Sequence, residues 1–124
     1  IGHHYPGKGK IGAKQAYEFA SSNPNTRMTL APLGGGLAFY HSMPEVKNLT
    51  NVYYDTAAQP LLYKPDVYMS LKFTGALDKV VLGTDYPLLQ TKIYLKHMAE
   101  SGLSSQDIHK ICVSNPSHML KLTS

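Results

Sequence analysis

The feature that most constrains the fold is a short apolar run, residues 80–87, that ends at a carboxylate. Its sequence is Val-Val-Leu-Gly-Thr-Asp-Tyr-Pro, and the proline prevents a strand from continuing. Buried strands of parallel sheets are short, continuous apolar runs of this kind. Because α/β proteins place their chemistry at the carboxyl ends of such strands, Asp85 is the first candidate for a functional residue.

Two further runs predict strands, at residues 28–31 and 51–55. Helical spacing and capping residues predict helices between and after the strands, at residues 13–22, 37–49 with a break at Pro44, 65–75, 89–100, 104–113 and a short one from 115. Residues 60–64 are expected to form a loop. This alternation of helices and strands predicts right-handed crossovers and a parallel sheet.

The carboxyl ends of parallel strands lie on one side of the sheet. Three segments should therefore meet at one rim: residues 32–36, 55–59 and 85–88. If Ile1 ends an earlier strand, His3 and His4 lie there too. Neutral imidazole is the commonest metal ligand, so His3 and His4 join Asp85 as candidate metal ligands. Adjacent residues of an extended segment point opposite ways, so only one of the two histidines would face the site.

Three parallel strands are too few for a closed barrel, which needs about eight. We therefore expect an α/β fold in which residues 1–124 form a single domain, half of a TIM-type (β/α) barrel with C-terminal helices. Such a sheet has two open edges, which predicts a homo-oligomer or pairing with a missing N-terminal half. The chain starts at Ile1 rather than at methionine, which favours a piece of a longer protein or a processed product.

The composition fits a globular protein, with 43% hydrophobic and 16% charged residues. The net charge of +4 comes from scattered basic residues rather than from a stripe, so we expect no nucleic-acid partner. No stretch reaches the roughly 18 apolar residues of a membrane span, so no membrane partner is expected. A single cysteine, Cys112, and the lack of a signal-peptide layout predict a cytoplasmic protein.

Other polar motifs have simpler explanations. Residues 7–12 match a dinucleotide-binding glycine pattern, but no full strand precedes them and no acid follows at the required distance. Residues 34–36, three glycines, could bind an anion or simply allow tight packing at a turn. Asp55 is best explained as a cap or an ion-pair residue at the rim. Cys112, within a predicted helix, is best explained as a buried structural thiol.

Several motifs together resemble a known family. They are Leu-Ala-Pro-Leu-Gly-Gly-Gly-Leu-Ala-Phe-Tyr at 30–40, Asn-Val-Tyr-Tyr-Asp-Thr-Ala-Ala at 51–58 and Val-Leu-Gly-Thr-Asp-Tyr-Pro-Leu at 81–88. The closing segments at 102–107 and 115–120 and the loop at 2–9 fit as well. The chain resembles the C-terminal half of the amidohydrolase-related metal-dependent hydrolases, the branch that includes aminocarboxymuconate-semialdehyde decarboxylase-like enzymes.

The resemblance implies a distorted (β/α)8 barrel with a divalent metal, zinc or manganese, at its carboxyl rim. Asp85 then corresponds to the aspartate of the eighth strand, which binds metal or acts as the base for the attacking water. The implied function is hydrolysis of a small carbonyl, lactone or amide substrate by metal-activated water. Two alternatives stay open: a decarboxylase of the same family, and a catalytically inactive half-barrel that self-associates through its open edges.

The resemblance also shows which family ligands this chain does not supply. The His-x-His pair of the first strand lies outside the sequence, and the histidine of the fifth strand would fall before Ile1. Pro32 stands where the sixth strand usually carries histidine, and proline cannot bind metal. Catalytic zinc commonly uses three protein ligands, so one carboxylate does not make a site. The chain alone is therefore expected to lack most metal ligands. A chain without any bound metal is the alternative to a zinc or manganese site.

Overall fold

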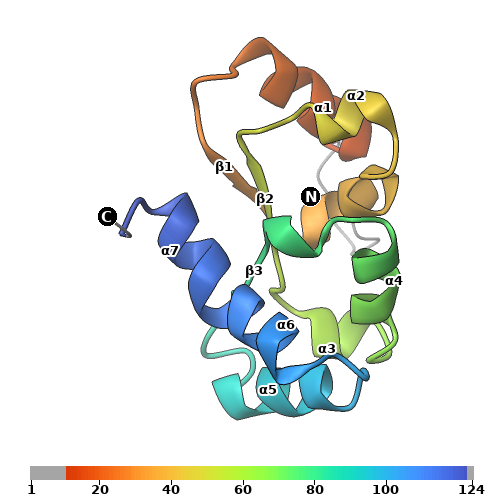
Figure 1. Ribbon diagram of the computed structural model, residues 1–124, viewed down its shortest axis with the longest axis vertical. Helices are drawn as coiled ribbons and strands as arrows, with labels where there is room; N and C mark the ends of the chain where they lie inside the picture. Colours follow the sequence, from red (N-terminus) through yellow and green to blue (C-terminus); the bar gives the residue numbers. More distant parts are fainter. Residues whose placement is uncertain (1–10, 123–124) are drawn as a thin grey trace.

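Helices and strands alternate along the chain in the computed structural model, which describes residues 11–122 (Figure 1). The strands are β1 Met28–Leu30, β2 Val52–Asp55 and β3 Val80–Val81. The helices and helical turns are α1 Ala13–Ser22, η1 Leu33–Tyr40, α2 Pro44–Lys47, α3 Gln59–Leu62, α4 Val67–Phe73, η2 Leu77–Lys79, α5 Thr91–Ala99, α6 Ser105–His109, η3 Lys110–Ser114 and α7 Asn115–Met119. Within these residues, no helix has the length and apolar character needed to cross a bilayer.

The strands form one parallel sheet in the order β1-β2-β3. Thr29 is paired with Tyr53, and Asp55 with Val81. The α/β class and the parallel sheet are therefore confirmed. The sheet is open within residues 11–122, which is compatible with part of a barrel, and the half-barrel stays a prediction.

Most predicted elements are found, with differences that have local causes. The loop predicted at residues 60–64 is wrong for residues 60–62, because α3 covers Gln59–Leu62, and residues 63–64 are non-helical as predicted. Pro60 lies in the first turn of α3, where a helix does not need the missing N–H. Helical turns also begin earlier than expected in η1, where Gly34, Gly35 and Gly36 have φ of 64°, 59° and 104°. Glycine adopts these left-handed values without a Cβ clash.

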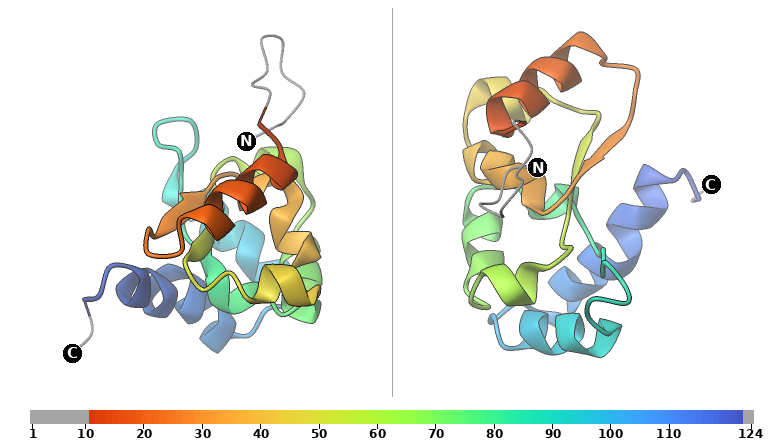
Figure 2. Two further views of the ribbon diagram at one scale, coloured as in Figure 1. Left: turned by 90° about the horizontal axis from the view of Figure 1, so that it is seen from above. Right: turned by 180° about the vertical axis from the view of Figure 1, so that it is seen from behind.

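The C-terminal helices form one continuous run rather than two separate helices. α6 begins with the predicted cap, in which the Asp107 N–H donates to Ser104 Oγ at 3.1 Å. The π-helical segment η3 then joins α6 directly to α7. Figure 1 and Figure 2 show α7 on the opposite side of the strands from α2 and α4.

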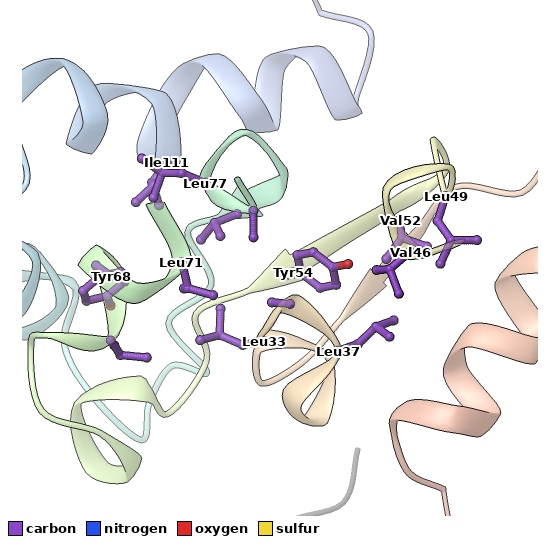
Figure 3. Packing of buried hydrophobic residues seen from close by; sticks show 14 of the residues in the cluster. Leu33, Leu37, Val46, Leu49, Val52, Tyr54, Tyr68, Leu71, Leu77 and Ile111 are labelled. Carbon is purple, nitrogen blue, oxygen red and sulfur yellow. The ribbon is translucent and has the colours of Figure 1, made fainter. Parts of the chain in front are cut away.

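The core lies between the sheet and the helices η1, α2 and α4 (Figure 3). Alternate residues of β2 face opposite sides, as the period of a strand requires. Val52 and Tyr54 enter the core cluster, where Leu33 and Leu71 are almost fully buried. Tyr53 points the other way and lies beneath Lys79, whose Nζ is 5.1 Å from the ring centroid.

The outer edge of β3 is covered by the chain itself. The Leu82 N–H, just after the strand, donates to Ile111 O at 3.0 Å. Asn115 Nδ2 donates to Val80 O at 2.7 Å and to Leu77 O at 2.9 Å. Backbone groups that a neighbouring strand would pair with are thus satisfied by η3 and α7. The expectation of two open edges therefore fails at β3, while β1 is an edge strand among the described residues.

Candidate functional site

Two of the three predicted rim segments meet beyond the carboxyl ends of β2 and β3. Thr56, which is fully buried, joins them: its Oγ1 donates to Gly83 O at 2.9 Å and accepts from the Gly83 N–H at 3.1 Å. Asp55 ends β2, and Asp85 follows Gly83 by two residues. The carboxylates are close enough for Asp85 to raise the pKa of Asp55.

The third predicted segment, residues 32–36, serves packing on the helix-covered side. Leu33 is 1% exposed and belongs to the core cluster. A Cβ added to Gly34 would lie 3.1 Å from Tyr54 Cδ1 and from Leu37 Cβ. The close-packing explanation of these glycines is therefore favoured over an anion site. Pro32, at the usual histidine position, offers no side-chain donor atom.

Asp55 is a half-buried carboxylate held against the neighbouring strand end. It accepts a hydrogen bond from the Ala57 N–H, in keeping with a capping role. A Cβ on Gly83 would overlap the Asp55 carboxylate, so only glycine permits this approach. Burial raises the pKa of Asp55, the Ala57 N–H lowers it, and the charge of Asp85 raises it again, with a net upward shift.

This shift predicts a pH effect of Asp55→Asn on stability. The pKa of Asp55 is higher in the folded state than in the unfolded chain, so folding favours its protonated form. Its contribution to folding stability is therefore fully present below pH 3.8 and is lost as the pH rises through the folded-state pKa. Asparagine removes the charge and keeps an acceptor for the Ala57 N–H. Because water screens a half-buried group, we expect a gain of about 0.5 kcal/mol at pH 7 and none at pH 4.

Urea unfolding at the two pH values measures this effect. Asp66→Asn, at an exposed aspartate with no cap hydrogen bond, is the matched control and should leave stability unchanged. Equal unfolding midpoints of Asp55→Asn and the wild type at pH 7 would show that the Asp55 charge is not costly.

Asp85 is exposed and lies on a loop that extends away from the helices (Figure 2). Its φ of 50° is left-handed, a conformation that aspartate tolerates better than most residues. The Asp85 carbonyl accepts from the Leu88 N–H at 2.8 Å, which closes the turn. Residues held in sparsely populated conformations cluster at functional sites, so this geometry supports Asp85 as a functional candidate.

Tyr94 is a rim residue that the sequence pattern did not single out. Its hydroxyl donates to Thr84 O at 2.7 Å and accepts from the Ala58 N–H at 3.0 Å, which ties the loops after β3 and β2 together. Burial raises its pKa, and both rim aspartates add to the shift. The signal available in the sequence was its helical spacing from Met98, since both are fully buried on one face of α5.

The histidine, cysteine and carboxylate side chains of residues 11–122 do not fit a catalytic zinc or manganese ion. Within residues 11–122, no three histidine, cysteine, aspartate or glutamate side chains gather into a metal-binding group. The two buried histidines are engaged elsewhere, His41 beside the Tyr54 hydroxyl and His97 with Tyr63 O. His3 and His4, the predicted ligands besides Asp85, lie outside the described residues.

Comparison with known proteins supports the resemblance that the motifs suggested. A family model described as amidohydrolase matches residues 14–122, which includes all three strands and the C-terminal helices. No curated protein and no solved structure gave a significant match. The matched region contains both rim aspartates and Tyr94.

Proposed function

Because the chain belongs to the amidohydrolase family, we propose that it is the C-terminal portion of a hydrolase acting on a small carbonyl, lactone or amide substrate. The observation that carries the proposal is the exposed Asp85 after the last strand, beside the half-buried Asp55. Carboxyl ends of parallel strands are where barrel enzymes hold their catalytic groups. The family typically uses a divalent metal, and the described donors alone do not form its site.

Asp85 is proposed as the general base. A solvent-exposed carboxylate can accept the proton of a water that attacks a carbonyl carbon. Asp55, whose pKa is raised, and the Tyr94 hydroxyl hold the surrounding loops and shape the potential around Asp85. Base catalysis of this kind contributes about 10²–10⁴-fold to a rate.

An assay of Asp85→Asn tests this proposal. The purified protein is offered 4-nitrophenyl acetate, a small lactone and a 4-nitroanilide, and CO₂ release from small unsaturated acids is followed as the signature of the decarboxylase variant. We expect the substitution to lower the rate about 100-fold. Asp66→Asn, an exposed aspartate on α4's amino end, should retain the wild-type rate. Wild-type activity in Asp85→Asn would contradict the proposed base.

A second candidate function, self-association of a catalytically inactive half-barrel, is favoured by one observation. The described sheet ends at β1, whereas the edge of β3 is already covered by η3 and α7. Edge strands readily pair with another chain. Self-association is therefore proposed to use β1 rather than both edges.

Sedimentation equilibrium at micromolar concentration tests this second candidate. A lysine on an edge strand discourages pairing, so Thr29→Lys should convert a dimer into a monomer. Thr91→Lys places the same charge on an exposed position of α5 and should leave the dimer intact. A wild-type protein that is monomeric and well folded would contradict self-association.

A further inference from the structure

A cavity of about 650 Å³ lies on the side of the sheet that α7 covers. Its lining includes Tyr53, Lys79, His109, Ser114, Ser117 and His118. Lys79 comes directly before β3, whereas Asp85 comes after it, so the cavity lies toward the amino ends of the strands. It is therefore a different site from the rim that carries the proposed hydrolase chemistry.

The charged side chains in the lining of this cavity are Lys79 and Asp78. Lys79 Nζ lies over the Tyr53 ring and 3.3 Å from Thr50 O, and among residues 11–122 no carboxylate is within ion-pair distance of it. Asp78, the acidic residue in the lining, is paired with Lys110 at 2.8 Å. Burial lowers the pKa of Lys79, and the charge of the neighbouring Asp78 offsets part of this effect.

Several hydrogen-bond donors line the same cavity as this lysine. The π-helical η3 brings Ser114 opposite His109, with Ser114 Oγ 3.2 Å from His109 Nδ1. Extra-wide helical turns of this type are frequent at functional sites. His118 and Ser117 add an imidazole and a hydroxyl from α7. A lysine, two imidazoles and two hydroxyls together offer several N–H and O–H donors and an unneutralised positive charge.

We propose that this cavity binds a phosphate group, either inorganic phosphate or the phosphate of a small monoester. Lysine binds phosphate as a point charge, and hydroxyl and imidazole donors complete the contacts to its oxygens. A carboxylate ligand would satisfy fewer of these donors, because it presents two oxygens rather than three or four. The proposal does not depend on hydrolase activity, because it involves the opposite end of the strands.

Titration of the full chain with inorganic phosphate, followed through the histidine ring signals in NMR, tests the proposal. Sodium chloride keeps the ionic strength constant. We expect saturable shifts of His109 and His118 at millimolar phosphate, while His97 in α5, which contacts Tyr63 O, stays unchanged. A parallel titration with glycerol phosphate distinguishes the two sources: tighter binding identifies a monoester, and equal or weaker binding identifies free phosphate.

Lys79→Met retains the apolar stem over Tyr53 and removes the charge, and it should weaken phosphate binding at least tenfold. Lys92→Met, at an exposed lysine in α5, is the matched control and should bind as the wild type does. His118→Gln, at an exposed position, provides a second variant should Lys79→Met fail to fold, and it should weaken binding severalfold. Non-saturable shifts, shifts that sodium chloride reproduces, or equal affinity in the variants would overturn the proposal.

Discussion

Tyr54→Ala is expected to lower the free energy of unfolding by about 4 kcal/mol, the cost typical of removing a large buried aromatic side chain. Tyr54 is fully buried in the central strand, where its ring packs against Gly34 of η1, and Figure 3 shows it within the core cluster. Among residues 11–122 the sheet has three strands, and Tyr54 lies in the middle one, so its truncation would leave a cavity within the core. Chemical denaturation measures the loss directly.

Tyr54→Phe separates packing from hydrogen bonding at this position. The hydroxyl is 3.4 Å from His41 Nδ1, near the upper limit for a hydrogen bond. Phenylalanine should therefore lose only about 1 kcal/mol. Phe19→Ala, at a ring that is 60% exposed on α1, is a control for aromatic truncation and should cost little. A Tyr54→Ala protein as stable as Phe19→Ala would contradict the central role given to this ring.

Asn115→Ala is expected to cost about 3 kcal/mol, because a buried carbonyl left without a partner costs about 1–3 kcal/mol and the truncation leaves a small void besides. Asn115 is 8% exposed and donates to both Val80 O and Leu77 O. Leu77 O keeps a second donor, the Val80 N–H, so most of the loss arises at Val80 O. Thermal unfolding should show a lower midpoint.

An exposed asparagine gives the matched control for this substitution. Asn25→Ala, in the turn before β1, should change stability by less than about 0.5 kcal/mol. Hydrogen exchange adds a local measurement, since the Leu82 N–H should lose protection when α7 loosens. Unchanged protection of Leu82 in Asn115→Ala would show that η3 is held on β3 by other contacts.

The sequence was sufficient for the strands because each is an apolar run that ends in a turn residue or a carboxylate. Val80, Val81 and Tyr54 are buried as this pattern predicts. The parallel order followed from the helices between the strands. The loop assignment failed at residues 60–62, because Pro60 occupies the first turn of α3, where a helix tolerates proline.

The candidate site was predictable only in part, because contacts between distant residues leave no local signal. Asp85 and Asp55 could be placed at one rim from topology alone. The bonds from Tyr94 to Thr84 and Ala58 depend on how α5 lies across the loops, which no spacing rule gives. The contact of Asn115 was not predictable either. Asn115 and Pro116 predict the start of a helix, but they do not predict the hydrogen bond from Asn115 to Val80 O in β3.

The hydrogen bonds that η3 and α7 make to β3 have a kinetic consequence for any strand that would pair at this edge. A strand that binds at this edge would compete with η3 and α7 of the same chain. The effective concentration of such a tethered segment is of millimolar order for a short flexible connection. Assembly at this edge would therefore be limited by release of Asn115 and Ile111 rather than by diffusion. The bonds from Asn115 to Val80 O and from the Leu82 N–H to Ile111 O would have to break before another strand could pair at this edge.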